Sequence, residues 1–138
     1  MNGKQLMKSI VEAFEQSDLQ PLLDALHEDI VWKSASKSHF FSFRGEHRGL
    51  HGVRETLANI SKDYIFNYMK PKEIVASGNV VWGYFDTAVT YYAGGARKNS
   101  KPIQLDMAIR WRLKGGKIIE HSTFFDSAHL AMEQISQP

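Results

Sequence analysis

Three side chains in the second half of the sequence could exchange protons with a substrate: the carboxylates of Asp106 and Asp126 and the imidazole of His121. Asp106 stands in a segment that is otherwise rich in apolar and bulky residues. If it faced an apolar interior, desolvation would raise its pKa, and it could act as an acid near neutral pH. A histidine near a carboxylate could remove a proton next to a carbonyl group, which begins an isomerisation or an aldol-type cyclisation. We therefore treat these three residues as catalytic candidates.

Each candidate also has a purely structural interpretation. Asp126 precedes the segment Ser127-Ala128-His129-Leu130 and is well placed to cap a helix. Strand alternation puts Asp106 on the same face as Arg110, which favours an outward side chain, for example at a dimer interface, unless a bulge reverses the strand. His121 is as compatible with a hydrogen-bonded histidine within a sheet as with a group in a pocket.

The elements that must position these groups follow from hydrophobic periodicity. Apolar residues at helical spacing predict helices over residues 4–16, from Asp18 to about His27, over 53–64 and over 126–134. Alternating apolar and polar residues predict strands that begin at Ile30, resume from residue 66 to 76, and cover 80–92, 103–113 and 117–125. Lys114-Gly115-Gly116 predicts a tight hairpin. Helices followed by a run of strands predict an α+β fold, with the helices packed on one face of an antiparallel sheet.

Length and composition favour one domain over residues 1–138. The chain has no cysteine, which excludes disulfides, thiol catalysis and cysteine-based zinc sites. The densest basic group, Arg97, Lys98 and Lys101, has no interleaved aromatic residue, so we interpret it as a solvated loop and expect no nucleic-acid partner. No apolar stretch has the length of a membrane span or the form of a signal peptide, so we expect no membrane partner and a cytoplasmic location.

The segment 34–50 combines several serines with three phenylalanines. The phenylalanines are Phe40, Phe41 and Phe43. Aromatic residues in a polar loop suggest a lid or rim over a pocket, and packing against the edge of the core explains them equally well. His39, His47 and His51 lie in or beside this segment, but their spacing lacks the HExxH pattern of a helical zinc site. We expect no metal site here.

Several segments, in this order and at this spacing, resemble the nuclear transport factor 2-like superfamily, and within it the SnoaL-like polyketide cyclase and ketosteroid isomerase branch. They are Ser17-Asp18-Leu19, residues 26–32, residues 48–53, residues 116–121 and Phe124-Phe125-Asp126. The resemblance implies a conical, curved antiparallel sheet wrapped around N-terminal helices, as in a cystatin-like α+β roll, with a pocket at the open end. It also implies a homodimer through the outer face of the sheet.

The resemblance also implies where site residues would lie. The position of the isomerase base falls at Ser34 and that of the first-helix tyrosine at Ile10, and neither side chain can serve in the isomerase reaction. Limonene epoxide hydrolase, another relative, uses an Arg-x-Asp strand motif and the aspartate that ends its last strand. Asp86 and Asp126 correspond to these two aspartates, whereas Tyr84 holds the position of the arginine. Asp86 therefore joins the catalytic candidates.

An apolar pocket with a few hydroxyl and indole groups is implied as well. The candidate ligand-binding residues are Trp32, Phe41, Tyr64, Trp82 and Tyr84. One hypothesis is an enzyme that needs no cofactor and isomerises, cyclises or hydrolyses a small apolar or aromatic carbonyl compound. The other is a non-catalytic module for ligand binding or protein assembly, favoured by the missing isomerase and hydrolase signatures. Fold alone does not decide between them.

Overall fold

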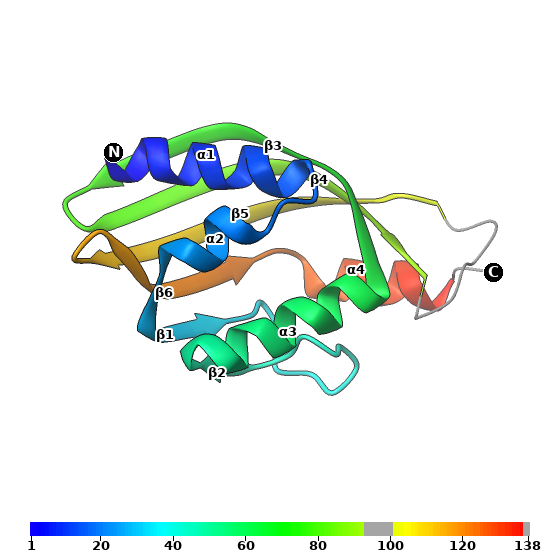
Figure 1. Ribbon diagram of the computed structural model, residues 1–138. Coiled ribbons are helices and arrows are strands. Elements are labelled where there is room, and N and C mark those ends of the chain that lie inside the picture. Colours follow the sequence, from blue (N-terminus) through cyan, green and yellow to red (C-terminus); the bar gives the residue numbers. More distant parts are fainter. Residues whose placement is uncertain (93–100, 137–138) are drawn as a thin grey trace.

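A curved six-stranded sheet organises the described part of the chain, which is residues 1–92 and 101–136 of the computed structural model (Figure 1). The helices are α1 (Gly3–Glu15), α2 (Gln20–Ala25), α3 (Gly49–Asp63) and α4 (Ser127–Ile135). The strands are β1 (Leu26–Lys33), β2 (Glu46–Arg48), β3 (Tyr64–Ser77), β4 (Val80–Tyr91), β5 (Ile103–Lys114) and β6 (Lys117–Phe124). Their order in the sheet is β2-β1-β6-β5-β4-β3. Arg97 and Lys98, interpreted above as part of a solvated loop, lie outside the described residues.

The predicted α+β class is confirmed, with the N-terminal helices on one face of the curved sheet (Figure 1). The neighbouring strands pair antiparallel except β1 and β6, which run parallel. Strands β1 and β6 are far apart in the sequence, with α3 and strands β3, β4 and β5 between them. No tight hairpin therefore requires this pair to run antiparallel. Within the described residues, no helix is both long enough and apolar enough to cross a membrane.

Helix α1 packs closely against β3 and β4, and a glycine on β4 permits the short distance. Asn2 begins the helix by accepting a hydrogen bond from the backbone N–H of Gln5, whose side chain in turn accepts from the backbone N–H of Asn2. The inner side of the helix buries Met7 and Ile10. On β4, a Cβ atom at Gly83 would lie 2.6 Å from the Sδ atom of Met7, so the absence of a side chain there permits the close approach.

Strand β5 shows the predicted alternation between a buried and an exposed face. Its buried residues are Ile103, Leu105, Met107, Ile109 and Trp111. The pairing of β4 with β5 is continuous, without a bulge, from Val80 to Val89. Asp106 therefore lies on the outer face, opposite Asp86, as plain alternation predicts.

Strand β6 departs from plain alternation. Ile118 and Glu120 pair with consecutive residues of β5, so Ile119 is one extra residue on β6. Such a bulge exchanges the faces of the strand beyond it. As a result, Ile118 and His121 are both buried although they are three positions apart, and Glu120 is on the outer face with the arginines of β5.

Several element boundaries differ from the sequence prediction: α3 begins at Gly49 rather than at residue 53, and β2 (Glu46–Arg48) was not predicted. Leu26, expected in the second helix, begins β1, and Tyr64, expected in the third helix, begins β3 with an extended backbone. Both residues are apolar and fit helical spacing as well as strand spacing. Pairing decides the outcome, because Leu26 lies opposite Ile118 and Tyr64 lies opposite Tyr91.

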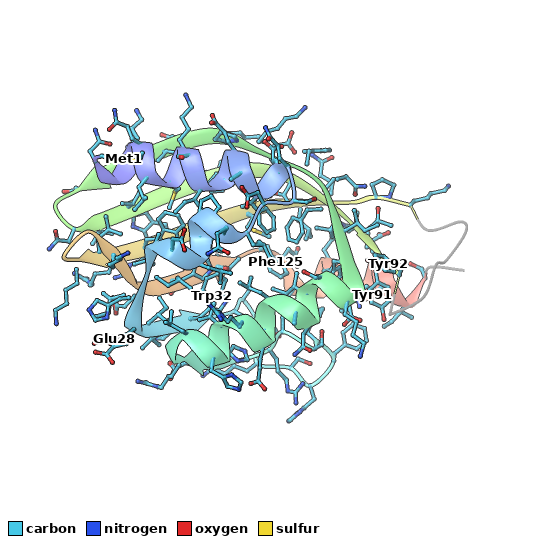
Figure 2. All side chains as sticks on the ribbon, in the orientation of Figure 1. Met1, Glu28, Trp32, Tyr91, Tyr92 and Phe125 are labelled. Atoms are coloured by element: carbon cyan, nitrogen blue, oxygen red, sulfur yellow. The ribbon has the colours of Figure 1, made fainter. Side chains whose placement is uncertain are left out.

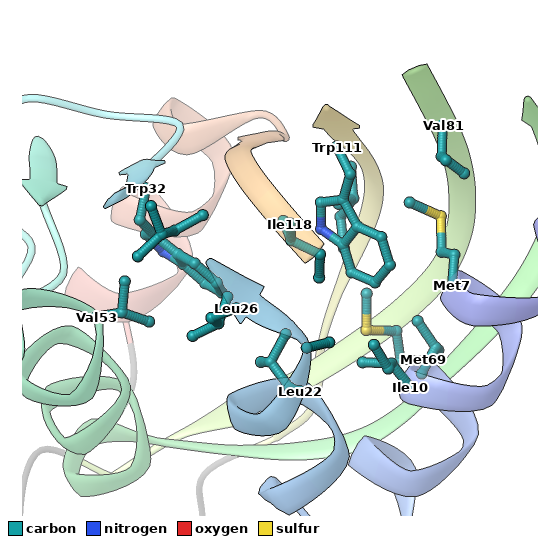
Figure 3. Packing of buried hydrophobic residues seen from close by; sticks show 14 of the residues in the cluster. Met7, Ile10, Leu22, Leu26, Trp32, Val53, Met69, Val81, Trp111 and Ile118 are labelled. Carbon is teal, nitrogen blue, oxygen red and sulfur yellow. The ribbon is translucent and has the colours of Figure 1, made fainter. Parts of the chain in front are cut away.

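The core fills the space between the helices and the concave face of the sheet (Figure 3). Met7, Ile10 and Leu22 come from the helices and face Trp111 and Met69 of the sheet. A second cluster of buried residues lies toward α4. Its members are Phe41, Phe43, Tyr64, Val89, Ile103, Leu105 and Leu130. The candidate site described below is lined by residues of both clusters.

Candidate ligand-binding cavity

A cavity of about 130 Å³ lies between the sheet and the helices. Its walls come from α1, α2, α3, α4, every strand except β2, and the segment after β1. Figure 2 shows how the side chains of these elements converge on the space between the helices and the sheet, with Trp32 and Phe125 near its middle. Strand alternation supplies much of the wall, because the buried face of β5 contributes Leu105, Met107 and Ile109.

The described residues that line the cavity include no Asp, Glu, Lys or Arg. Four of them carry a polar group on the side chain that is not an indole: Ser34, Tyr64, His121 and Thr123. The other lining residues are aliphatic or aromatic. The cavity is thus an apolar, uncharged space with a few polar groups, which is the usual character of a small-molecule site.

His121 is the central polar group, and its ring is held on three sides. It is 4% exposed, and its ring stacks on Trp32 with 3.5 Å between ring centroids and 8° between planes. The Nε1–H of Trp111, directly opposite on β5, donates to Nδ1 over 2.9 Å. The other nitrogen, Nε2, lies 2.6 Å from the hydroxyl oxygen of Thr123.

These contacts fix the tautomer of His121. An indole N–H can only donate, so Nδ1 must be an unprotonated acceptor. The single proton of the neutral ring is then on Nε2 and is donated to Thr123. Burial lowers the pKa of His121 to about 3, because a charged imidazole would lose its hydration in this apolar space. His121 is therefore neutral at physiological pH, and neither ring nitrogen is free to take a proton from a ligand.

The other polar lining groups are also hydrogen-bonded. Ser34 donates from its hydroxyl to the carbonyl oxygen of Ser36 over 2.6 Å. The Tyr64 hydroxyl donates to the side-chain oxygen of Gln134 on α4. Burial, together with the nearby Asp63 carboxylate, raises the pKa of Tyr64 above its ordinary value, so the phenol stays protonated.

Three of the residues predicted from sequence are brought together at the cavity: Trp32, Tyr64 and His121. Phe41 is buried beside it and does not line it, although it stacks on the lining residue Phe43 with 4.9 Å between ring centroids. The phenylalanine-rich segment therefore contributes to the wall mainly by packing.

The three predicted aspartates lie elsewhere. Asp126 is exposed at the N-terminus of α4, where it accepts a hydrogen bond from the backbone N–H of His129 over 3.0 Å. Asp86 accepts from Gln104 over 2.9 Å on the outer face of the sheet, and Asp106 beside it is 3.7 Å from the Lys72 ammonium. The expectation that a carboxylate meets His121 in the cavity is corrected by these positions.

Two of the predicted ligand-binding residues also lie on the outer face. Trp82 and Tyr84 are 41% and 39% exposed, because β4 places them on the opposite side from the buried Val81 and Phe85. Trp82 stacks on Phe124 of β6 rather than facing the cavity. Their aromatic character alone gave no information on which face of the strand they occupy.

Thr123 and Trp111 are the functional residues that sequence reasoning missed. Thr123 is two positions after His121, so a period of two on the last strand already placed both hydroxyl and imidazole on one face. Trp111 was predicted to be buried, but its bond to His121 depends on the bulge at Ile119. Within residues 1–92 and 101–136, no three His, Cys, Asp or Glu side chains are grouped so that they could hold a metal ion.

The chain resembles solved structures over nearly its whole length. An NTF2-like protein of unknown function from Burkholderia pseudomallei K96243 superposes with a TM-score of 0.83 at 22% identity, covering 96% of this chain and 97% of the other. TerC, crystallised with polyporic acid, gives 0.78 at 18% identity, with 96% and 97% covered. An epoxide hydrolase from M. tuberculosis, similar to limonene epoxide hydrolase, gives 0.69 at 17% identity, with 97% and 90% covered. At these identities the likeness shows the fold alone.

A search of curated proteins finds no match. The sequence model of the SnoaL-like domain family does match, over residues 7–121. This is most of the chain and runs from within α1 to His121 on β6. The fold and this match agree with the resemblance first indicated by the order of the sequence segments. The chain belongs to the SnoaL-like domain family.

Proposed function

We propose that this protein binds one small, neutral, mostly apolar molecule in the cavity between its helices and its sheet. The observation that carries the proposal is the lining, which combines apolar side chains with a few hydrogen-bonded polar groups and, among the described residues, no charged side chain. A charged ligand would lose its hydration there without gaining a partner of opposite charge. A neutral ring compound would lose little and would gain contacts on all sides.

The size of the cavity supports a ligand of about one ring. An apolar cavity of about 150 Å³ in another protein binds benzene, and the cavity here measures about 130 Å³. Trp32 and Trp111 present flat aromatic faces in its wall. That another protein of this fold, TerC, was crystallised with polyporic acid agrees with small-molecule binding as one use of the fold.

Catalysis by acid and base is the second candidate, and His121 is the residue that favours it. A general base must be unprotonated and must have a free nitrogen or oxygen within reach of the substrate. Both ring nitrogens of His121 are engaged, and Asp86, Asp106 and Asp126 do not line the cavity. Binding without turnover is therefore the function that the geometry supports better.

Tryptophan fluorescence offers a direct test, since two of the three tryptophans line the cavity. In a Trp82→Phe background the emission comes only from Trp32 and Trp111. Titration with benzene and toluene is expected to change this emission saturably. Ligand at ten times its Kd should also stabilise the fold by about 1.4 kcal/mol, measured as a shift of the thermal unfolding midpoint.

A matched pair of variants tells cavity binding from surface binding. Leu105→Phe adds bulk inside the cavity, and Gln104→Phe adds the same side chain one position away on the outer face. We expect the first variant to remain folded and lose the ligand response, and the second to keep it. If both variants respond like the parent, the ligand is not in the cavity. If no ligand gives a saturable change in the parent, the proposal is wrong.

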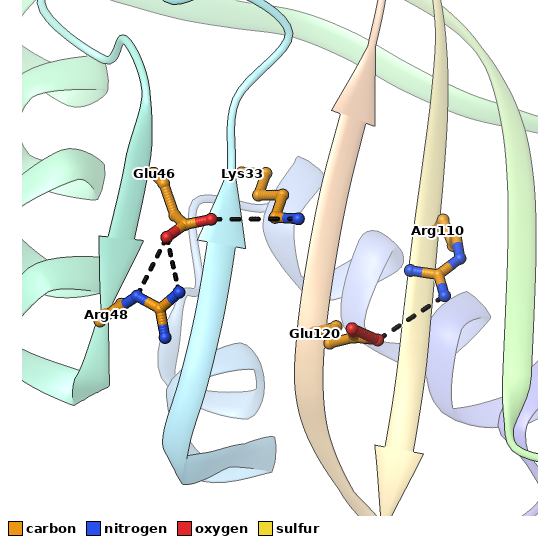
Figure 4. Close-up of polar contacts among 5 residues, drawn as sticks. All are labelled: Lys33, Glu46, Arg48, Arg110 and Glu120. Atoms are coloured by element: carbon orange, nitrogen blue, oxygen red, sulfur yellow. Dashed lines mark hydrogen bonds and ion pairs between the residues drawn. The ribbon is translucent and has the colours of Figure 1, made fainter.

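We also propose that the outer face of the sheet pairs with a second copy of the chain. Exposed apolar side chains gather there: Trp82 stacks on Phe124 with 5.8 Å between ring centroids, and Val75 lies opposite Trp82. Charges of both signs flank this row, and Figure 4 shows one such pair, Arg110 and Glu120, 3.6 Å apart. Exposed apolar patches with a polar surround mark interaction sites, and mixed charges allow two identical faces to meet.

Sedimentation tests the proposed dimer. The parent protein should sediment as a dimer of the 15.7 kDa chain, and the double variant Trp82→Lys, Phe124→Lys as a monomer. Met132 on α4 is 69% exposed and away from the sheet, so Met132→Lys is the matched control and should remain dimeric. A parent that sediments as a monomer at every accessible concentration would refute this face as a self-association surface.

A further inference from the structure

The hydrogen bonds around His121 leave one hydroxyl proton uncommitted at the cavity. Trp111 donates to Nδ1, so the ring donates its only proton from Nε2 to the oxygen of Thr123. Because that oxygen is the acceptor in this bond, the hydroxyl proton of Thr123 is not used in it. No other hydrogen bond of the Thr123 side chain is formed with the described part of the chain.

The other two hydroxyl groups of the wall do not offer such a proton. Ser34 donates its proton to Ser36, and Tyr64 donates its proton to Gln134. The indole N–H of Trp32, stacked on His121, is a second donor without a partner among the described residues. The hydroxyl of Thr123 and the indole N–H of Trp32 thus have no acceptor among the described residues, and a ligand that brings an acceptor to this end of the cavity can pair with one of them.

The chain of bonds also strengthens Thr123 as a donor. An oxygen that accepts a hydrogen bond becomes a better donor through its own proton, because consecutive hydrogen bonds polarise one another. The two upstream members are held firmly: Trp111 is 2% exposed and His121 is 4% exposed. The oxygen of Thr123, which is half-buried, is therefore held by two buried residues, and its hydroxyl proton can turn toward a ligand.

Resting on the proposed binding function, we infer that Thr123 selects ligands with a neutral acceptor oxygen, of which a ketone or aldehyde carbonyl is the simplest. Thr123 contacts the ligand in this role, whereas His121 and Trp111 act as positioning residues. A carboxylate ligand is disfavoured by the lack of a cationic lining group among the described residues. A pure hydrocarbon would fit the space but would leave the Thr123 proton unpaired.

Two ring compounds of nearly equal shape separate the hydrogen bond from the rest of binding. Cyclohexanone carries a carbonyl oxygen where methylenecyclohexane carries a CH₂ group. Their affinities for the parent, Thr123→Val and Thr123→Ser proteins can be measured by NMR chemical-shift titration. Valine keeps the shape of threonine and removes the hydroxyl, and serine keeps the hydroxyl. Thermal unfolding of each variant checks that it is folded.

We expect Thr123→Val to weaken cyclohexanone binding roughly fivefold, the worth of one ordinary hydrogen bond, and to leave methylenecyclohexane unweakened. Thr123→Ser should restore most of the cyclohexanone affinity. The infrared C=O stretch of the bound ketone should lie at lower frequency in the parent and serine proteins than in the valine protein. A valine variant that treats both compounds like the parent refutes the role of Thr123 while cavity binding stands. Failure of both compounds to bind the parent refutes the binding function itself.

Discussion

Acid should destabilise this protein through His121, and the size of the effect follows from its buried position. Burial lowers the pKa of His121 from its ordinary 6.5 to about 3 in the folded protein. Between these two values the unfolded chain binds a proton on His121 and the folded chain does not. The free energy of unfolding therefore keeps its full value above pH 6.5 and falls as the pH drops from 6.5 toward 3.

At pH 5, which is about 1.5 units below the ordinary pKa of histidine, the loss from this one residue is about 2 kcal/mol at about 1.4 kcal/mol per unit. A loss of this size is a large share of the stability of a small domain, about 5–15 kcal/mol. Other titrating groups also change stability with pH. Their contribution cancels when the parent is compared with a variant that differs only at position 121.

The variant of choice is His121→Gln. The glutamine amide can accept from Trp111 through its oxygen and donate to Thr123 through its nitrogen, as the neutral ring does, but it does not titrate. Urea unfolding of both proteins at pH 7, 6 and 5 gives two stability curves. We expect the difference between them to shrink or reverse by about 2 kcal/mol between pH 7 and pH 5. A constant difference over this range would show that His121 titrates normally, and the account of a buried neutral ring would be wrong.

Three further substitutions test other parts of the structure. Gly83→Ala should cost about 1–3 kcal/mol in urea unfolding, because its Cβ would press on Met7 and Phe85; a neutral result would contradict the tight packing of α1. Asp126→Ala should lower the free energy of unfolding by about 1 kcal/mol, because α4 loses its cap. Calorimetric titration with cavity ligands should show unchanged affinity. A loss of affinity would show that Asp126 contributes to the site. Thr56→Val should be neutral or stabilising by chemical denaturation, because the buried hydroxyl of Thr56 has no hydrogen-bond partner in the part of the chain that the structure describes. Destabilisation beyond about 1 kcal/mol would reveal an unrecognised partner.

The sequence predicted the parts of the fold that depend on regular repetition. The alternation through residues 103–113 fixed which face of β5 is buried, and with it the outward direction of Asp106. The ends of the helices at Leu26 and Tyr64 were predicted less well, because both residues fit helical spacing as well as strand spacing. Pairing with distant strands determines that both belong to strands. Local preference therefore located the elements, and long-range pairing set their limits.

The candidate site was harder to predict because its chemistry depends on which face a side chain occupies. Asp86 was chosen by its position relative to a family pattern, but the direction of β4 places it on the outer face. Asp126 was a catalytic candidate with a second interpretation as a helix cap, and the structure places it at the cap of α4. His121, chosen as a catalytic candidate, does line the cavity, yet its protonation state depends on the indole donor across the hairpin. This contact depends on how β5 and β6 are aligned. Regular pairing from the turn at Gly115-Gly116 would have placed Glu120, rather than His121, opposite Trp111.

The bulge at Ile119 determines whether the imidazole of His121 or the carboxylate of Glu120 faces the cavity. If Ile119 were paired regularly opposite Arg112 instead of being bulged, Glu120 would lie opposite Trp111 and face inward, and His121 would face outward. An apolar space whose described lining residues include no cation would then receive a carboxylate. A buried carboxyl in such surroundings has a raised pKa and is a natural proton donor or acceptor. The pairing of the last strand thus separates a neutral cavity from an acidic one, with no change to any lining side chain of the other elements. Within a single fold, a shift of one residue in strand register can therefore alter the chemistry of a cavity as sharply as a substitution in it.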